Sequence, residues 1–269
     1  MSGSPPAPSR SAIVDRLRAA GCVFAEDEAQ LLISAARTPA DLAAMVARRA
    51  EGRPLEHVLG WVEFGGLRIA VDAGVFVPRR RTEHLVREAA DLAREAAALR
   101  TPVVVLDLCC GSGAVGVVLA AALDRAELYA VDVDPVAVRC ARRNVAAVGG
   151  GVYQGDLYGP LPASLRGHVD ILAANAPYVP TEALALLPPE ARVHEPSVAL
   201  DGGADGLDVL RRVIAEAPRW LAPGGHVLIE TGEHQAPQAV EAIADAGLIP
   251  RVSRFDAPNA TVVIGTRPR

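Results

Sequence analysis

Apolar and polar residues follow two different patterns along this chain of 269 residues. At residues 11–20, 26–36 and 39–50, apolar side chains recur at helical spacing, which predicts short amphipathic helices. Between residues 52 and 78 the pattern alternates and is broken by glycines, which predicts a β-hairpin or an extended linker around Gly65 and Gly66. We therefore expect a disordered start at residues 1–10, a helical domain at 11–56 and a hairpin linker at 57–78.

From residue 79 onward, strand and helix patterns alternate. Thr82 is a plausible N-cap for a helix that runs towards Leu99. Strands are then predicted at residues 103–108, 127–131, 151–154, 169–174, 226–230, 249–254 and 261–266, with helices at 114–123, 135–148, 207–221 and 235–246. Such alternation is typical of an α/β domain with a mostly parallel sheet and helices on both faces. We assign residues 79–269 to this domain and expect its ligands beyond the carboxyl ends of the strands.

Composition narrows the function classes. Hydrophobic residues make up 51% of the chain, enough for a sizeable core, and the net charge of −5 offers no broad footprint for nucleic acid. The cysteines, Cys22, Cys109, Cys110 and Cys140, have no metal-ligand spacing and fit a reduced compartment. No apolar run approaches the roughly 18 residues of a membrane span. We expect a soluble cytoplasmic protein without a metal site.

The stretch at residues 103–116, VVVLDLCCGSGAVG, is the first candidate for chemistry. An aliphatic run ends near Asp107 and breaks into a loop with Gly111, Gly113 and Gly116. Glycines allow positive φ and leave no Cβ between the main chain and a ligand. The pattern fits a nucleotide-like ligand, and an ordinary strand-to-helix turn has the same pattern.

Acidic residues recur at the predicted strand ends. Asp107 can steady the glycine loop or meet a cationic group of a ligand. Asp132 follows the second strand, where a carboxylate can accept both hydroxyl hydrogen bonds of a ribose. Asp156 follows the third strand, where it or the adjacent main chain can meet an adenine ring. Together they favour an adenosine-containing ligand over three unrelated helix caps.

The fourth strand ends in Asn175, Ala176, Pro177 and Tyr178. An amide side chain, a carbonyl fixed by the following proline and an aromatic ring suit a planar substrate with an NH2 group. Asn175 and the Ala176 carbonyl can accept its two N–H bonds, and Tyr178 can stack on its face. Hydride transfer by a dinucleotide enzyme has no need of this arrangement.

With these motifs in this order, the chain resembles the HemK/PrmC family of S-adenosylmethionine-dependent methyltransferases. The resemblance covers nearly all of the sequence after the first residues. It rests on PLEHVLGWVEFGGLRI, VPRRRTEHLV, DLCCGSGAVG, AVDVDP, the Asn-X-Pro-Tyr motif, HEPSVALDGGADGLDVLRRVI and LAPGGHVLIE. It implies a class I, Rossmann-like fold with a seven-stranded sheet and a small N-terminal helical domain. It also implies S-adenosyl-L-methionine as cofactor and the GGQ glutamine of a peptide chain release factor as methyl acceptor.

The resemblance also implies roles for individual residues. Asn175, Ala176, Pro177 and Tyr178 would hold the target glutamine. The implied cofactor-binding residues are Asp107, Cys109, Cys110, Gly111, Ser112 and Gly113 around the loop, Asp132 and Val133 at the ribose, Asp156 and Leu157 at the adenine, and Asn175.

The chain departs from the family pattern in three places. Ala176 stands where the family usually has proline, Cys109 replaces the first loop glycine, and Arg80 with Arg81 replaces a less basic pair. Residues 79–81 would line a ligand entrance or form a solvated loop.

Other parts of the site stay open at this point. Glu195, Asp201 and Glu230 are further candidates for its lining, and no general base is assigned. Two alternatives remain. One is a methyltransferase for another planar amine, such as another protein glutamine or a nucleobase amino group, and the other is a non-catalytic S-adenosylmethionine-binding module.

Overall fold

The computed structural model describes residues 8–98, 101–256 and 260–269. The chain begins with a helical bundle of α1 (Arg10–Ala19), α2 (Ala25–Ala35) and α3 (Pro39–Ala50). Their apolar faces meet in a small core of their own, because short helices need partners to bury them. The helix α1 starts one residue earlier than predicted, and most of the predicted disordered start lies outside the described residues.

The predicted hairpin follows a short helix that the sequence pattern did not indicate, α4 (Leu55–Leu59). Strands β1 (Trp61–Phe64) and β2 (Leu67–Ala70) pair antiparallel across Gly65 and Gly66, both at positive φ. Phe64 is 1% exposed and belongs to the same apolar core as the main sheet. The side chain of Asn144 bonds both the N–H and the carbonyl of Ala70. The hairpin is therefore packed onto the main domain.

The main sheet has seven strands in the order β5-β4-β3-β6-β7-β9-β8. Their bounds are β3 (Val103–Leu108), β4 (Ala126–Asp132), β5 (Gly151–Gln154), β6 (Val169–Ala174), β7 (Leu221–Thr231), β8 (Ile249–Phe255) and β9 (Ala260–Thr266). Strands β3 to β7 pair in parallel, and β9 pairs antiparallel with both β7 and β8. The predicted mostly parallel α/β sheet is confirmed.

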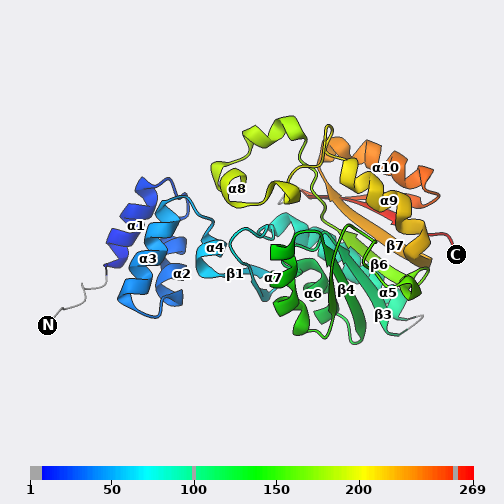
Figure 1. The fold of residues 1–269 in the computed structure, drawn as a ribbon, viewed down its shortest axis with the longest axis horizontal. Coiled ribbons are helices and arrows are strands. Elements are labelled where there is room, and N and C mark those ends of the chain that lie inside the picture. Colours follow the sequence, from blue (N-terminus) through cyan, green and yellow to red (C-terminus); the bar gives the residue numbers. More distant parts are fainter. Residues whose placement is uncertain (1–7, 99–100, 257–259) are drawn as a thin grey trace.

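Helices cover both faces of this sheet (Figure 1). One face packs on α5 (Glu83–Ala97), α6 (Ala114–Ala121) and α7 (Pro135–Ala146). The other packs on α9 (Asp208–Trp220) and α10 (Ala236–Asp245). Because both faces are buried, the central strands are mostly apolar, with Asp107 in β3 and Asp170 in β6 as exceptions.

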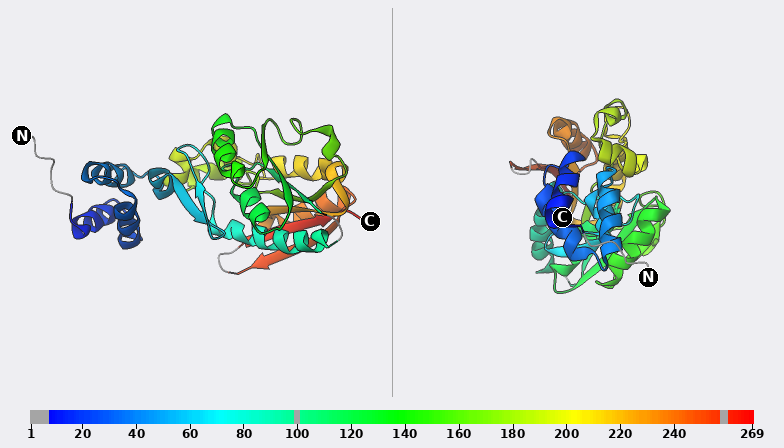
Figure 2. Two further views of the ribbon diagram at one scale, coloured as in Figure 1. Left: turned by 90° about the horizontal axis from the view of Figure 1, so that it is seen from below. Right: turned by 90° about the vertical axis from the view of Figure 1, so that its left-hand side faces the viewer.

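The molecule is elongated, with the helical bundle at one end and the C-terminus at the other (Figures 1 and 2). Between the bundle and the sheet lies a segment of short helical turns (Figure 1): η3 (Thr181–Leu186), α8 (Pro189–His194) and η4 (Ser197–Ala199). The sequence pattern predicted no element there. Within the described residues, no helix combines the length and the apolar character needed to cross a membrane.

Candidate active site

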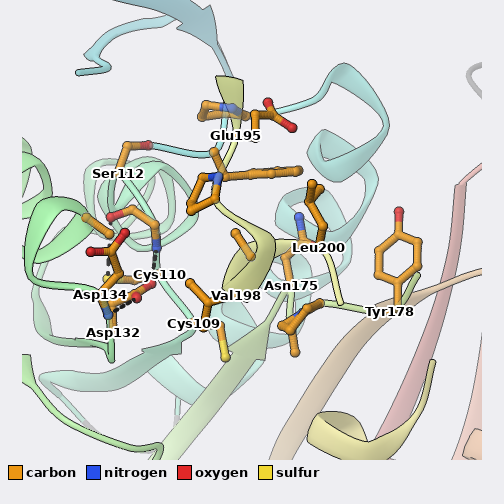
Figure 3. A pocket seen from close by; sticks show the side chains of 18 of the residues that line it. Cys109, Cys110, Ser112, Asp132, Asp134, Asn175, Tyr178, Glu195, Val198 and Leu200 are labelled. Atoms are coloured by element: carbon orange, nitrogen blue, oxygen red, sulfur yellow. Dashed lines mark hydrogen bonds between the residues drawn. The ribbon is translucent and has the colours of Figure 1, made fainter. Parts of the chain in front are cut away.

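A cavity of about 890 Å³ opens at the carboxyl ends of β3, β4, β5 and β6. Figure 3 shows Ser112, Asp132 and Asp134 on one side of it and Asn175 on the other. The cavity is also lined by the 76–82 segment and by residues 187–200. All the residues that the sequence implied for cofactor and substrate line this one cavity, except Gly113, which ends the loop beside it.

The glycine loop leaves β3 through a run of left-handed backbone. Cys109, Gly111 and Gly113 have φ of 55°, 55° and 78°. A non-glycine residue rarely adopts such a φ, so Cys109 holds a strained conformation where the family usually has glycine. The loop is closed by hydrogen bonds from the Cys110 N–H to the Val131 carbonyl at 3.0 Å and from the Gly113 N–H to the Cys110 carbonyl at 2.7 Å.

Asp107 bonds to the first turn of α6. The buried carboxylate accepts a 2.8 Å hydrogen bond from the Gly116 N–H. A Cβ on Gly116 would lie 2.7 Å from a Leu128 methyl and 3.0 Å from the Asp107 carboxylate, so this close approach favours glycine. Burial raises the pKa of Asp107 to about 7, against the opposing effect of the Gly116 N–H.

Asp132 ties the loop to the end of β4. Its Oδ2 accepts from the Gly111 N–H at 2.8 Å, and its Oδ1 accepts from the Asp134 N–H at 2.9 Å. Burial raises the pKa of Asp132 although these N–H groups favour the charged form. Each carboxylate oxygen keeps a further lone pair for a hydroxyl donor.

Ser112 and Leu157 have unusual features beside the cavity. The Ser112 Oγ is buried against the cavity and has no hydrogen-bond partner among the described residues. Leu157 has a φ of 46°, a conformation that non-glycine residues adopt mainly where the surroundings impose it. Beside it, Asp156 is largely exposed and forms an ion pair with Arg212 on α9. Val133 also lines the cavity, and half of its surface is exposed.

Asn175 leaves the sheet directly after β6. Its Nδ2 donates to the Thr82 Oγ1 at 3.2 Å, a contact between residues 93 positions apart. Thr82 immediately precedes the helix, as predicted for an N-cap, but its backbone is already helical and, among the described residues, its side chain makes no capping bond. The Thr82 hydroxyl is turned to the substrate motif instead.

Tyr178 is fixed at both ends of the residue. Its hydroxyl donates to the Glu230 Oε1 at 3.2 Å, and its carbonyl accepts from Gln235 Nε2 at 3.0 Å. Arg81 donates to the same Glu230 oxygen at 3.1 Å and lies 5.7 Å from the Tyr178 ring centroid. Burial, and then the Glu230 charge, raise the pKa of the tyrosine, so its hydroxyl stays protonated.

Residues 187–200 close the cavity on the side of the helical bundle, and sequence reasoning missed all of them but one. Glu195, 1% exposed in its side chain, accepts from Arg79 Nη2 at 2.5 and 2.6 Å and from the Val77 N–H at 3.1 Å. These hydrogen bonds hold residues 187–200 against residues 77–79. Arg79 and Arg81 line the cavity, and Arg80 does not.

The other candidates divide differently. Glu230 accepts a hydrogen bond from the Tyr178 hydroxyl and does not itself line the cavity. Asp201 only shapes a loop, by accepting from the Thr181 hydroxyl and the Gly203 N–H. Burial raises the pKa of the Cys109 and Cys110 thiols, so neither is a nucleophile at neutral pH.

Comparison with known proteins agrees with this geometry. The family model for the methyltransferase small domain matches residues 72–186. A solved methyltransferase from Pyrococcus furiosus shares the fold, with a TM-score of 0.55 at 18% identity over 76% of this chain and 90% of that one.

Two curated relatives are similar in sequence. The 4-amino-L-phenylalanine/4-methylamino-L-phenylalanine methyltransferase of Streptomyces pristinaespiralis is 38% identical over 71% of this chain and 65% of its own length. The release factor glutamine methyltransferase of Geobacter sulfurreducens is 39% identical over 234 residues, which are 85% of this chain and 79% of the relative. This chain is therefore a methyltransferase that belongs to the release factor glutamine methyltransferase family.

Proposed function

We propose that this protein transfers the methyl group of S-adenosyl-L-methionine to the side-chain amide nitrogen of a glutamine, the GGQ glutamine of a peptide chain release factor. One observation carries the proposal: a single cavity joins the glycine loop and Asp132 to Asn175 and Tyr178. The name of the Geobacter relative supports the acceptor, since the two sequences align over most of both chains.

The polar groups around the glycine loop fit S-adenosylmethionine. Asp132 has acceptor capacity for the ribose hydroxyls, and the Ser112 hydroxyl lacks a partner among the described residues. A Cβ on Gly111 would meet nothing within 4 Å, so the main chain there is open to close approach. When bound, the cofactor supplies an electrophilic methyl group on a positively charged sulfur, which departs as a neutral thioether.

The chain's own residues must overcome the weak nucleophilicity of an amide. The nitrogen lone pair is delocalised into the carbonyl, so the reaction needs the nitrogen held in line with the methyl carbon. Positioning contributes roughly 7–11 kcal/mol in the best-oriented cases. We assign this task to Asn175 Oδ1 and the Ala176 carbonyl as acceptors for the two N–H bonds, and to the ring of Tyr178 beside the amide plane.

The same acceptors favour the positive charge that builds on the nitrogen as the new N–C bond forms. The nitrogen then releases one proton to water, so the scheme requires no general base. The raised thiol pKa values of Cys109 and Cys110 agree with a direct transfer to the acceptor.

The test measures tritiated methyl transfer to a purified release factor, with mass spectrometry of the labelled residue. A release factor whose GGQ glutamine is replaced by alanine is the control substrate. Asn175→Ala should abolish methyl transfer and weaken cofactor binding far less. Asp132→Ala should instead weaken cofactor binding, measured by isothermal titration calorimetry.

Other acceptors give distinct results in the same assay. Labelling of a different protein in a lysate, with the release factor unlabelled, would keep the chemistry and reject the acceptor. Methylation of 4-amino-L-phenylalanine in preference to the release factor would assign a small aromatic amine, as the name of the Streptomyces relative suggests for that protein. Absence of any heat on titration with S-adenosylmethionine would reject this cofactor, and only the assignment of the fold would remain.

A further inference from the structure

Two adjacent residues outside the sheet contact both polar side chains of the Asn-X-Pro-Tyr motif. Arg81 and Thr82 end the short helix η1 (Arg80–Thr82), just before α5. Thr82 bonds Asn175, and Arg81 reaches Tyr178 through Glu230 and over its ring. Both Arg81 and Thr82 line the cavity, so the 81–82 pair stands where the methyl acceptor must enter.

Thr82 holds the Nδ2 end of the Asn175 amide. An amide has a donor end and an acceptor end that are nearly identical in shape, so sterics alone do not distinguish its two orientations. Thr82 is 2% exposed, and its Oγ1 accepts from the Nδ2 of Asn175. In this arrangement Oδ1 is left for another donor, which is the polarity that an NH2 substrate needs.

Arg81 decides how Tyr178 is held. Oε1 of Glu230, a residue that is 2% exposed, accepts from both the Tyr178 hydroxyl and Arg81 Nε, and Oε2 has no partner among the described residues. A buried carboxylate that loses its cation is strongly destabilised and rearranges or takes up a proton. Without Arg81, the anchor of the Tyr178 hydroxyl therefore changes.

We infer that Arg81 and Thr82 are positioning residues for the substrate motif: Thr82 orients the amide of Asn175, and Arg81, through Glu230, holds the ring of Tyr178. The inference rests on the proposed methyl transfer for its functional meaning. Both residues act through another side chain, so their loss affects transfer far more than cofactor affinity.

The first test compares Thr82→Val with Thr82→Ser. Valine keeps the shape and removes the hydroxyl, and serine keeps the hydroxyl. Thr82→Val should lower kcat by about 10- to 100-fold, with the cofactor Kd within about twofold of wild type, because small misplacements of reacting groups have effects of this order. Thr82→Ser should restore kcat to within about threefold. Equal losses in both variants, or a loss confined to cofactor affinity, would overturn the role of Thr82.

The second test is a double-mutant cycle between Arg81→Gln and Tyr178→Phe, with Arg80→Gln as the matched control. Arg81→Gln should lower kcat/KM for the acceptor by about tenfold, and Arg80→Gln, at an exposed position, should change it by less than twofold. In the Tyr178→Phe background the effect of Arg81→Gln should shrink to less than about threefold, because the hydroxyl that it supports is gone. Additive losses would reject the route through Tyr178.

A measurement without turnover separates this inference from the proposed function. In nitrogen-15-labelled protein, the side-chain amide signal of Asn175, assigned with Asn175→Asp, should shift in Thr82→Val and stay in place in Thr82→Ser. This comparison needs no acceptor, so it is decisive even if the release factor is not the substrate. An unchanged amide signal in Thr82→Val would show that Thr82 does not orient Asn175. Circular dichroism confirms that both variants fold.

Discussion

Replacing Asp107 by asparagine should make the stability of this protein less dependent on pH. Asp107 lies under the glycine loop, 1% exposed, and accepts the Gly116 N–H. Asparagine keeps an acceptor oxygen for that N–H and carries no charge. The substitution therefore removes the titration of the group and leaves its contact with α6.

The magnitude follows from the raised pKa. Burial moves the pKa of Asp107 from 3.8 to about 7, so the folded protein binds this proton more tightly than the unfolded chain does. The free energy of unfolding therefore falls as the pH rises from about 4 to about 7, and the loss is complete above that range. At about 1.36 kcal/mol per pKa unit, the full loss is about 4 kcal/mol, of which about 3 kcal/mol falls between pH 5 and pH 8.

Urea denaturation of both proteins at pH 5 and pH 8 measures this difference. Groups that do not interact with Asp107 titrate alike in the two proteins, so they cancel in the comparison. Asp107→Asn should gain about 3 kcal/mol relative to wild type between the two pH values. A gap that stays constant with pH would refute the reasoning, because it would mean that the Asp107 carboxylate is ionised in the folded protein throughout this range.

Three further substitutions test the packing. Phe64→Ala should lower the free energy of unfolding by about 3–5 kcal/mol in urea titration, because Phe64 fills the main core from the hairpin; a loss below about 1 kcal/mol would mean that the hairpin is not part of that core. Arg49 donates to the buried Glu28 carboxylate at 2.6 and 3.0 Å, so Arg49→Met leaves that charge without its partner. The substitution should lower the free energy of unfolding by about 3–5 kcal/mol. Hydrogen exchange should place that loss in the helical bundle, and uniform loss of protection would contradict it. Arg212→Gln removes only an exposed ion pair with Asp156 and should change stability by less than about 1 kcal/mol in the same titration.

The local sequence pattern predicted the strands of the sheet. It did not predict the segments whose structure depends on contacts with residues far away in the sequence. Strands β3, β5 and β6 have the bounds that the sequence predicts. For β3 and β6 the reason is that buried parallel strands are short, mostly aliphatic runs. Residues 181–200 have no sustained period. Their placement depends on Glu195, which bonds to Arg79 from 116 positions away, and no local signal marks such a contact.

Thr82 shows the same limit in a single residue. A threonine before an apolar helix is the usual sign of an N-cap, and the helix does begin at Glu83. The hydroxyl is nevertheless used by Asn175, which only the folded sheet brings near. Its local preference was overridden by a contact that serves the site, which is where such conflicts between levels are expected.

The adjacency of the two halves of the site follows from strand order and register. Strand β3 lies between β4 and β6, and Leu108 is level with both Val131 and Ala174. The next residues, Cys109 and Asn175, therefore leave the same edge of the sheet side by side, with Asp132 on the other side of the loop. A one-residue shift between β3 and β6 would turn alternate side chains to the opposite face and separate the substrate motif from the loop. Since buried aliphatic side chains on both faces of these strands fix that register, the fold itself places the Asn-X-Pro-Tyr motif beside the glycine loop.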